Sequence, residues 1–349
     1  MVTTIGATPA PAFAGTTIDG CAVVAHPNAT RFTDCPGADM SGADLSGADL
    51  SYADFAGADL SGADLSSAKL NHADLSDASL ATCSFLMPPL GDFTCRIADV
   101  TGTDLSQADL TGASLIGVDL ASDDLKGATL AGATLLTCLP PAVYSPECVT
   151  ANLSDADLAD ANLSGAGTSS CLTLDEGGDI GDLSYCGGVS MTGAKLTDAN
   201  LTGDNLSWTV MADDTLDGAT FAGAQFGGCA PSNPDIVVCS SADLAGARLR
   251  DVDLAGLQLD GAQLDGADLL GADLTGANLS PLDDPVFGTV VAVTDLSGAN
   301  LDRADLAGAD LNDATLTGAR LKGTTWSDTT CPDGTNSDSD GGTCANDLG

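Results

Sequence analysis

Aromatic residues and cations are scarce in this sequence. Among 349 residues there are 8 Phe, 3 Tyr and 2 Trp, and only 10 Lys and Arg stand against 50 Asp and Glu, a net charge of −40. The cations form no patch along the chain, so direct nucleic-acid binding through phosphate neutralisation is not expected. No run of about 18 uncharged apolar residues occurs, which excludes a transmembrane helix.

Residues that carry catalysis are equally sparse. The only histidines are His26 and His72, and no nucleophile–histidine–acid pattern, zinc-binding helix motif or phosphate-binding loop is convincing. Carboxylates are abundant, but on a flat wall they lack the cleft that shifts pKa values. The sequence therefore predicts a protein that is not an enzyme.

What the sequence has instead is one short unit, A-D-L-S-G, repeated with small variations. The large apolar residue of each unit is called its centre, and centres recur every five residues in 43 units. The centres run from Met40 to Leu80, Val100 to Leu135, Leu153 to Leu163, Met191 to Phe226, Leu244 to Leu279 and Leu296 to Trp326.

A period of five excludes both regular structures over any length. On an α-helix, successive centres would be 140° apart and would form no apolar stripe. On one long strand, an odd period would put successive centres on opposite faces. The chain must therefore turn a corner once per unit, with Ala and Leu inside, Asp outside and Ser-Gly at the turn.

Tandem A-[D/N]-L-x-x units resemble the pentapeptide-repeat family, over most of residues 38–327. This resemblance implies an all-β fold, a right-handed, four-sided parallel β-helix with four units per coil. Stacked coils would bury one another's Ala and Leu side chains. Three blocks contain eight units, or two whole coils, so their interruptions are expected to leave from one corner and align along one edge.

The twelve cysteines form six near pairs, and none has the spacing of a metal site. One local disulfide per pair is the simplest interpretation, with buried free thiols as the alternative, and it favours an oxidising compartment and a secreted protein. The predicted disulfides are Cys21–Cys35, Cys83–Cys95, Cys138–Cys148, Cys171–Cys186, Cys229–Cys239 and Cys331–Cys344.

The expected organisation follows from the repeats and the cysteines. Residues 1–14 contain Ala12-Phe13-Ala14, which fits a signal-peptide cleavage site, or else they are a disordered tail. Disulfide caps are expected at 15–37 and 328–349, because solenoid ends expose strand edges. The β-helix spans 38–327, with Cys-bracketed insertions near 83–95, 138–148, 171–186 and 229–239.

Three of the insertions combine proline with apolar side chains, as in S-F-L-M-P-P-L-G-D-F-T between Cys83 and Cys95. A row of stapled apolar loops would make a recognition surface. The alternative is that the loops fold back and cover the solenoid wall.

One metal site is a candidate. Asn336, Asp338 and Asp340, followed by Gly341 and with Asp347 at the twelfth position, have a spacing that resembles an EF-hand calcium loop. The flanking helices are missing and Cys344 lies inside the loop. The alternative is a turn rich in Asp, Ser and Gly. Ca²⁺ at the C-terminal cap is the only cofactor considered.

Asp precedes the centre in 20 of the 43 units, so the fold stacks carboxylates about 4.8 Å apart. Such pairs repel by roughly 1 kcal/mol in water-like dielectric. Added salt or divalent cations should therefore raise the thermal unfolding temperature. No change in that temperature up to molar salt would contradict the idea that the ladder is strained.

The sequence favours a secreted, non-enzymatic structural or binding scaffold, an acidic rod presenting loops to a protein or cell-surface partner. The alternative is a DNA-mimicking inhibitor or protector of a type II topoisomerase, a role known in the pentapeptide-repeat family. The net charge of −40 fits that role, but the cysteines do not suit the cytoplasm. Ice binding is a third hypothesis, which the scattered Thr residues do not favour.

Overall fold

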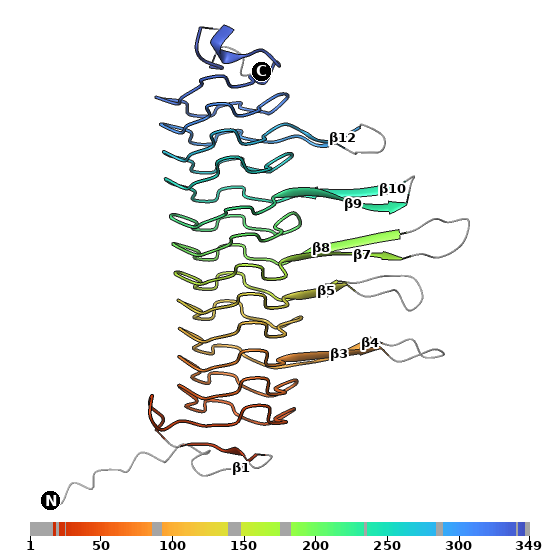
Figure 1. Ribbon diagram of the computed structural model, residues 1–349, viewed down its shortest axis with the longest axis vertical. Helices are drawn as coiled ribbons and strands as arrows, with labels where there is room; N and C mark the ends of the chain where they lie inside the picture. The colour runs from red at the N-terminus through yellow and green to blue at the C-terminus, as the bar shows by residue number, and fades with distance from the viewer. Residues whose placement is uncertain are drawn as a thin grey trace, which may run out of the picture.

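The chain is a straight four-sided column with its termini at opposite ends (Figure 1). This computed structural model describes residues 17–18, 21–24, 26–85, 93–138, 148–174, 183–233, 236–283, 289–339 and 341–345. The named elements are β1 Thr17–Ile18, β2 Cys21–Ala22, β3 Ala81–Phe85, β4 Phe93–Ile97, β5 Leu136–Cys138, β6 Cys148–Thr150, β7 Ser169–Leu174, β8 Leu183–Gly188, β9 Gly227–Asn233, β10 Ile236–Ser241, β11 Leu282–Asp283, β12 Val290–Ala292 and η1 Ser337–Ser339.

Each five-residue unit closes one β-turn. In the unit centred on Met40, the Ala43 N–H donates to the Met40 carbonyl at 3.0 Å, and Gly42 has φ of +68°. The Asp39 carboxylate accepts the Ser41 N–H at 3.1 Å, so the outward Asp orders the turn that follows it. This local bond explains why Asp or Asn recurs at the outward position.

Every fourth unit returns to the same side of the column. Asp39 lies opposite Asp59 in a parallel bridge, and this step of one coil recurs along the chain. The fold is the predicted right-handed quadrilateral β-helix. Its sides are called faces 1, 2, 3 and 4, after the units of Met40, Leu45, Leu50 and Phe55.

The core is a column of centres flanked by small inner residues, which stand two positions before each centre and are usually Ala. Three further units were not recognised from the sequence, because their centres are not large apolar residues. Cys35, Thr168 and Cys331 are buried at centre positions and complete the coils at both ends and at the short block.

The glycines at the corners, which have positive φ, give a stability prediction. A Cβ at Gly218, where φ is +74°, would lie 2.2 Å from Asp198 Oδ1, whereas at Gly203, with φ of +77°, it would meet nothing within 4 Å. Gly203→Ala should cost about 1–2 kcal/mol from left-handed strain alone. Gly218→Ala should cost roughly 1 kcal/mol more, since Asp198 must move.

Chemical denaturation of both variants measures the difference in free energy of unfolding. Asp198→Gly combined with Gly218→Ala should return the cost to that of Gly203→Ala. Equal costs for the two single variants would show that the carboxylate contact is unimportant.

Three aspartates stand at inner positions, where the repeat has Ala. Asp123, Asp204 and Asp214 are at most 2% exposed. Desolvation raises the pKa of Asp123 and Asp204 to about 7 and that of Asp214 to about 8, so the expectation that no carboxylate would be strongly shifted is wrong for these three. They differ from the stacked outward aspartates because their side chains point into the wall of the column.

Backbone donors hold these carboxylates only in part. Gly102 N–H donates to Asp123 Oδ1 at 2.8 Å, and Ala194 N–H donates to Asp214 Oδ1 at 2.9 Å. The second oxygen of each has no partner. Gly165 and Ala166 N–H groups approach Asp204 without reaching normal hydrogen-bond geometry.

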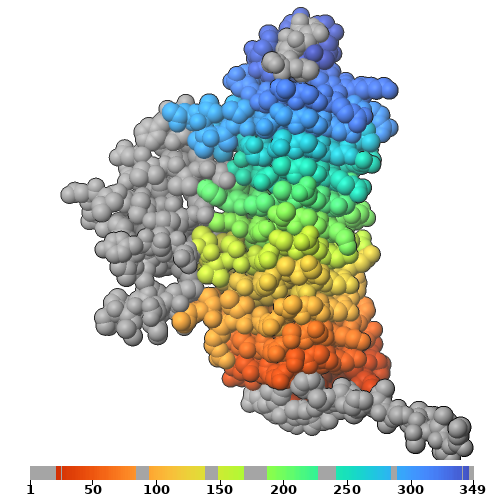
Figure 2. All heavy atoms as spheres, turned by 180° about the vertical axis from the view of Figure 1, so that it is seen from behind, coloured from red at the N-terminus to blue at the C-terminus, as the bar shows by residue number. Residues whose placement is uncertain are grey.

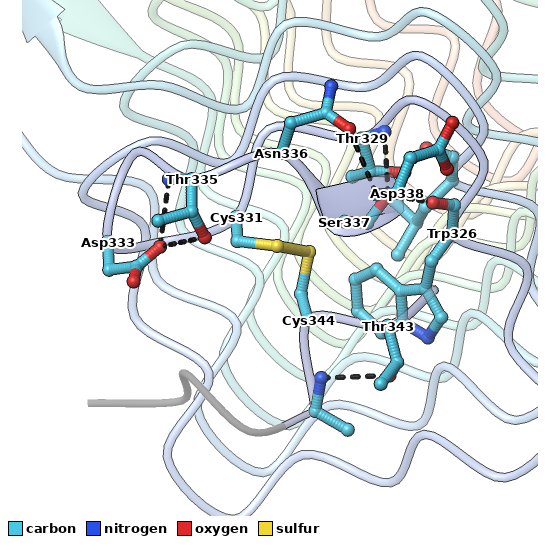
Figure 3. The surroundings of a disulfide bond; sticks show 12 residues. Trp326, Thr329, Cys331, Asp333, Thr335, Asn336, Ser337, Asp338, Thr343 and Cys344 are labelled. Atoms are coloured by element: carbon cyan, nitrogen blue, oxygen red, sulfur yellow. Dashed lines mark hydrogen bonds between the residues drawn. A yellow bond between two sulfur atoms is a disulfide. The ribbon is translucent and has the colours of Figure 1, made fainter. Parts of the chain in front are cut away.

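Disulfides close both ends of the column. At the N-terminal end Cys21 bonds to Cys35, and at the C-terminal end Cys331 bonds to Cys344 (Figure 3). Trp326, only 5% exposed, lies under the C-terminal cap, and the Ser337 hydroxyl donates to its carbonyl. Each cap is therefore bonded to the column through a cysteine, Cys35 or Cys331, that occupies a core position.

Candidate functional site

Five β-hairpins leave the column from a single corner, between faces 1 and 2 (Figure 1). Each hairpin follows a face 1 unit and precedes a face 2 unit, in place of a two-residue turn such as Ser61-Gly62. The alignment expected from the eight-unit blocks is thus confirmed. The hairpins, together called the row, are β3/β4, β5/β6, β7/β8, β9/β10 and β11/β12.

The bases of the hairpins cover the turns of neighbouring coils. A Cβ at Gly117 would lie 2.7 Å from Val149 of β6 and 3.0 Å from Ile97 of β4. The same corner three hairpins further on, at Gly261, is covered by Leu282 and Ala292. The absence of a side chain at these turns lets the hairpins dock on the column.

Neighbouring hairpins also contact one another. β5 contacts β7 and β8, β8 contacts β9 and β10, and β10 contacts β11 and β12. The row is therefore a continuous ridge from β5 to β12, held at its base by the coils. In the view from behind, residues of the last hairpin protrude from the column (Figure 2).

That last hairpin carries the most exposed apolar side chains of the described residues. Val290 is 59% exposed and Val291 is 47% exposed, both in β12, and Val293 beside them is also exposed. A short apolar strand left open at the end of a ridge is a surface suited to contact with a partner.

The cysteines of four hairpins face each other across the strands. Cys83 lies opposite Cys95 and bonds to it, with a Cα–Cα distance of 4.0 Å. Cys138 lies opposite Cys148, Cys171 opposite Cys186, and Cys229 opposite Cys239. The side chains of Cys138, Cys171, Cys186, Cys229 and Cys239 lie outside the described residues, so these three disulfides remain predictions.

The corner diagonally opposite the row collects the cations. The prediction that Lys and Arg form no patch is wrong for the folded protein, because the coils bring together positions that are far apart in sequence. Eight of the ten cations lie on face 3 or at the corner of faces 3 and 4, and Arg31 and Arg96 are the exceptions. The eight are Lys69, Lys126, Lys195, Arg248, Arg250, Arg303, Arg320 and Lys322.

These cations are interleaved with acids. Lys195 Nζ lies 3.3 Å from Asp157 Oδ2, Arg250 pairs with Asp268 at 2.5 Å, and further pairs are Arg248–Asp217, Arg320–Asp302 and Lys126–Asp160. The pairs are largely exposed, so each contributes little stability. Their effect is to make this edge nearly neutral in an otherwise acidic molecule.

The calcium hypothesis rests on four residues, of which two are described. Asn336 Nδ2 donates to Asp328 Oδ1 at 2.8 Å, and Asp328 N–H donates to Asp338 Oδ1 at 3.0 Å, so the side chains of Asn336 and Asp338 tie η1 to the last coil. Asp340 and Asp347 lie outside the described residues. Calcium binding stays a prediction.

No other metal or catalytic cluster occurs within the described ranges. Groups of three or more His, Cys, Asp or Glu side chains that could hold a metal ion are absent from them. His72 stacks on Tyr52 of the coil below, with ring centroids 4.9 Å apart, as a turn residue with φ of +59°. Of the helical residues described, none forms a segment long and apolar enough to cross a membrane.

Comparison with solved structures finds similarity to proteins of diverse roles. HetL from Nostoc sp. strain PCC 7120, a pentapeptide repeat protein involved in heterocyst differentiation regulation, is 26% identical, with 82% of this chain and 91% of HetL covered and a TM-score of 0.26. Full-length QnrB1, a plasmid-mediated fluoroquinolone resistance protein, is 15% identical, with 82% of this chain and 90% of QnrB1 covered and a TM-score of 0.25. A pentapeptide repeat protein of the Arabidopsis thaliana thylakoid lumen is 21% identical, with 56% of this chain and 68% of that protein covered and a TM-score of 0.12.

The comparison with curated proteins gives no match. The sequence pattern of pentapeptide repeats matches in eight copies, at residues 31–62, 38–77, 58–85, 98–122, 242–280 and 294–325. The five-residue turns, the four-sided coils and these matches agree. The chain belongs to the pentapeptide-repeat family.

Proposed function

We propose that this protein is a secreted, non-enzymatic scaffold whose hairpin row binds a protein or cell-surface partner. The observation that carries the proposal is that all five insertions leave the same corner, and that four of them, from β5 to β12, meet in one ridge. Insertions that served only to fill space would have no reason to share one corner. Pentapeptide-repeat proteins are typically non-enzymatic, which agrees with a binding role.

The compartment supports this role. The disulfides indicate an oxidising, non-cytoplasmic compartment. Two of them fasten the ends of the column and one fastens a hairpin of the row. Such covalent closure suits a rod that works outside the cell, where refolding is not assisted.

The topoisomerase alternative has less support. Duplex DNA presents negative charge along all of its length and around all of its circumference. Here face 3 and the corner between faces 3 and 4 together carry eight cations, several of them paired with acids. A partner that binds DNA by phosphate contacts would meet a nearly neutral edge on that side.

Two hairpins of the row can be replaced by the short turn of other coils, which makes the proposal testable. Replacing residues 227–241 by Ser-Gly, and residues 169–188 likewise, gives the two-residue turn that follows Leu60 in an uninterrupted coil. The double replacement should keep its free energy of unfolding within a few kcal/mol while losing at least tenfold in binding to intact cells of the source organism. The measurement is flow cytometry with the labelled protein.

The matched control replaces Ala131-Gly132, on a corner away from the row, by Ser-Gly and should bind as the original does. Equal cell binding with and without the two hairpins, or no binding by the intact protein, would contradict the proposal.

A further inference from the structure

Two successive coils separate along one corner of the column. One step below them, a normal hydrogen bond joins neighbouring coils, from Leu201 N–H to the Thr220 carbonyl at 2.8 Å. One step above them, Leu254 N–H donates to the Asp273 carbonyl at 2.7 Å. Between them, Thr220 still lies opposite Asp253, but no hydrogen bond of normal geometry joins Phe221 N–H to Asp253. The β-ladder is therefore stretched at this step.

The stretch covers faces 4 and 1 and reaches the corner between faces 3 and 4, where the Gly218 N–H has no hydrogen bond of normal geometry to a described residue. The N–H groups of Gly223, Asp253 and Gln258 also lack a normal hydrogen bond to any described residue. On faces 2 and 3 the same two coils are joined as usual, with Met211 N–H donating to Asp243 and Leu216 N–H to Arg248, both at 2.8 Å. The two coils thus open as a wedge at the corner between faces 4 and 1.

Oversized core residues account for the wedge. Phe221 and Phe226 occupy centres where Leu is usual, with ring centroids 5.3 Å apart. In the next coil, Val252 and Leu257 occupy inner positions where Ala is usual. Because the interior is close-packed, four larger side chains on two faces force the coils apart there.

The wedge leaves a hollow of about 220 Å³ that opens to solvent. Its floor is apolar, since Phe221 is 1% and Leu257 is 7% exposed. Its walls carry backbone donors and acceptors freed from the ladder, which need partners. No Lys or Arg lines it, and Asp253 and the net charge of −40 disfavour an anion. The lining residues are Thr220, Phe221, Ala222, Asp253, Ala255 and Leu257.

We propose that this hollow binds the acetamido group of an N-acetylated sugar in a cell-envelope glycan. The methyl would pack on Phe221 and Leu257, the carbonyl would accept an N–H of Phe221 or Gly223, and the amide N–H would donate to Asp253. The group is neutral, small and amphipathic, as the hollow requires. This site rests on the proposed envelope role but lies apart from the row.

A glycan fits the surroundings better than a peptide does. The hollow admits one small group, and the turns beside it, Ala222-Gly223 and Ala255-Gly256, are low and uncharged. A sugar ring can rest on such a low surface while it inserts one small substituent, whereas a peptide would need room for several side chains. The acetamido group then supplies specificity through its methyl and its two polar atoms.

The test is an NMR titration of ¹⁵N-labelled, disulfide-intact protein with N-acetylglucosamine, with glucose and N-methylacetamide as separate arms. We expect shifts confined to the amides of Phe221, Gly223, Asp253 and Leu257, with Kd on the order of millimolar for so small a ligand. Glucose should give none. Equal shifts with glucose, or shifts with N-methylacetamide but not with the sugar, would overturn the proposal.

Two variants make the test independent of folding defects. Phe221→Leu with Leu257→Ala restores the usual residues, so the freed amides of Phe221, Gly223, Asp253 and Gln258 should gain at least tenfold hydrogen-exchange protection and the sugar should bind at least tenfold more weakly. Ala255→Gln fills the hollow from its exposed rim and should weaken binding equally. Val118→Ala, at an inner position of another coil, should leave Kd unchanged.

The two proposals fail separately. The variant that lacks residues 169–188 and 227–241 should still bind N-acetylglucosamine, because neither hairpin lines the hollow. Unchanged sugar binding in both hollow variants would place any observed binding elsewhere and sink this inference, whatever the row does.

Discussion

The protein should be several kcal/mol less stable at pH 8 than at pH 5. The cause is the buried trio Asp123, Asp204 and Asp214, which the fold holds at inner positions of the wall. In the unfolded chain an aspartate titrates near 3.8, whereas burial raises the folded pKa to about 7, 7 and 8 respectively. Nearby carboxylates, Asp119 for the first and Asp213 for the last, add to the rise.

The sign follows from proton counting. Between pH 4 and pH 7 the folded protein holds protons that the unfolded chain has released, so the free energy of unfolding falls as the pH rises. Each group contributes a slope of up to about 1.4 kcal/mol per pH unit. The decline should level off only above about pH 9, where all three are ionised in both states.

Urea denaturation at pH 5, 6, 7 and 8 measures the slope. Asp123→Asn, Asp204→Asn and Asp214→Asn together should flatten it, because Asn keeps the shape but cannot ionise, and this variant should exceed the original in stability at pH 8. Asp109→Asn, an exposed ladder substitution on face 4, should leave the slope unchanged. Stability that rises from pH 5 to pH 8 would refute the assignment.

Replacing both Cys331 and Cys344 by Ala should cost more than replacing Cys83 and Cys95. The loops are alike, with separations of 13 and 12 residues, so chain entropy alone predicts a loss of about 3 kcal/mol for each. Cys331 and Cys344 are also fully buried, and Cys331 is the centre of a repeat unit. Its truncation should add roughly 1–3 kcal/mol through a cavity.

Chemical denaturation of the two double variants, compared at one pH, gives the difference. A further readout is hydrogen exchange of the last coil, around Trp326, which should accelerate only when the cap disulfide is removed. Identical losses for the two pairs would mean that disulfides stabilise this fold through the unfolded chain alone.

The spacing of the repeat was enough to predict most of the fold. A period of five leaves one solution, a turn in every unit, and the eight-unit blocks even placed the insertions at one corner. The terminal cysteines, by contrast, were interpreted as neighbours of the repeat, although Cys35 and Cys331 are part of it. Their centre positions follow from counting in fives from Met40 and Trp326, a signal the sequence contained.

Other features needed three dimensions. Lys69 and Lys322 share an edge only because coils stack positions that are far apart along the chain, so no linear scan would group them. The buried trio had a sequence signal, an acid where the inner Ala belongs, as in S-D-D-L before Lys126. The wedge had none, because Phe221 and Leu257 are ordinary residues singly and open the ladder only in adjacent coils.

Because four units make one coil, the number of units before a hairpin sets its phase, that is, the corner from which the hairpin leaves the column. Deleting one unit, for instance 101–105, would rotate every later hairpin by a quarter turn and split the row between two corners. Deleting four units would shorten the rod and keep the row straight. Length changes within a hairpin leave the phase untouched. Selection on such a protein should therefore tolerate insertions in the hairpins and purge those of one, two or three units in the column.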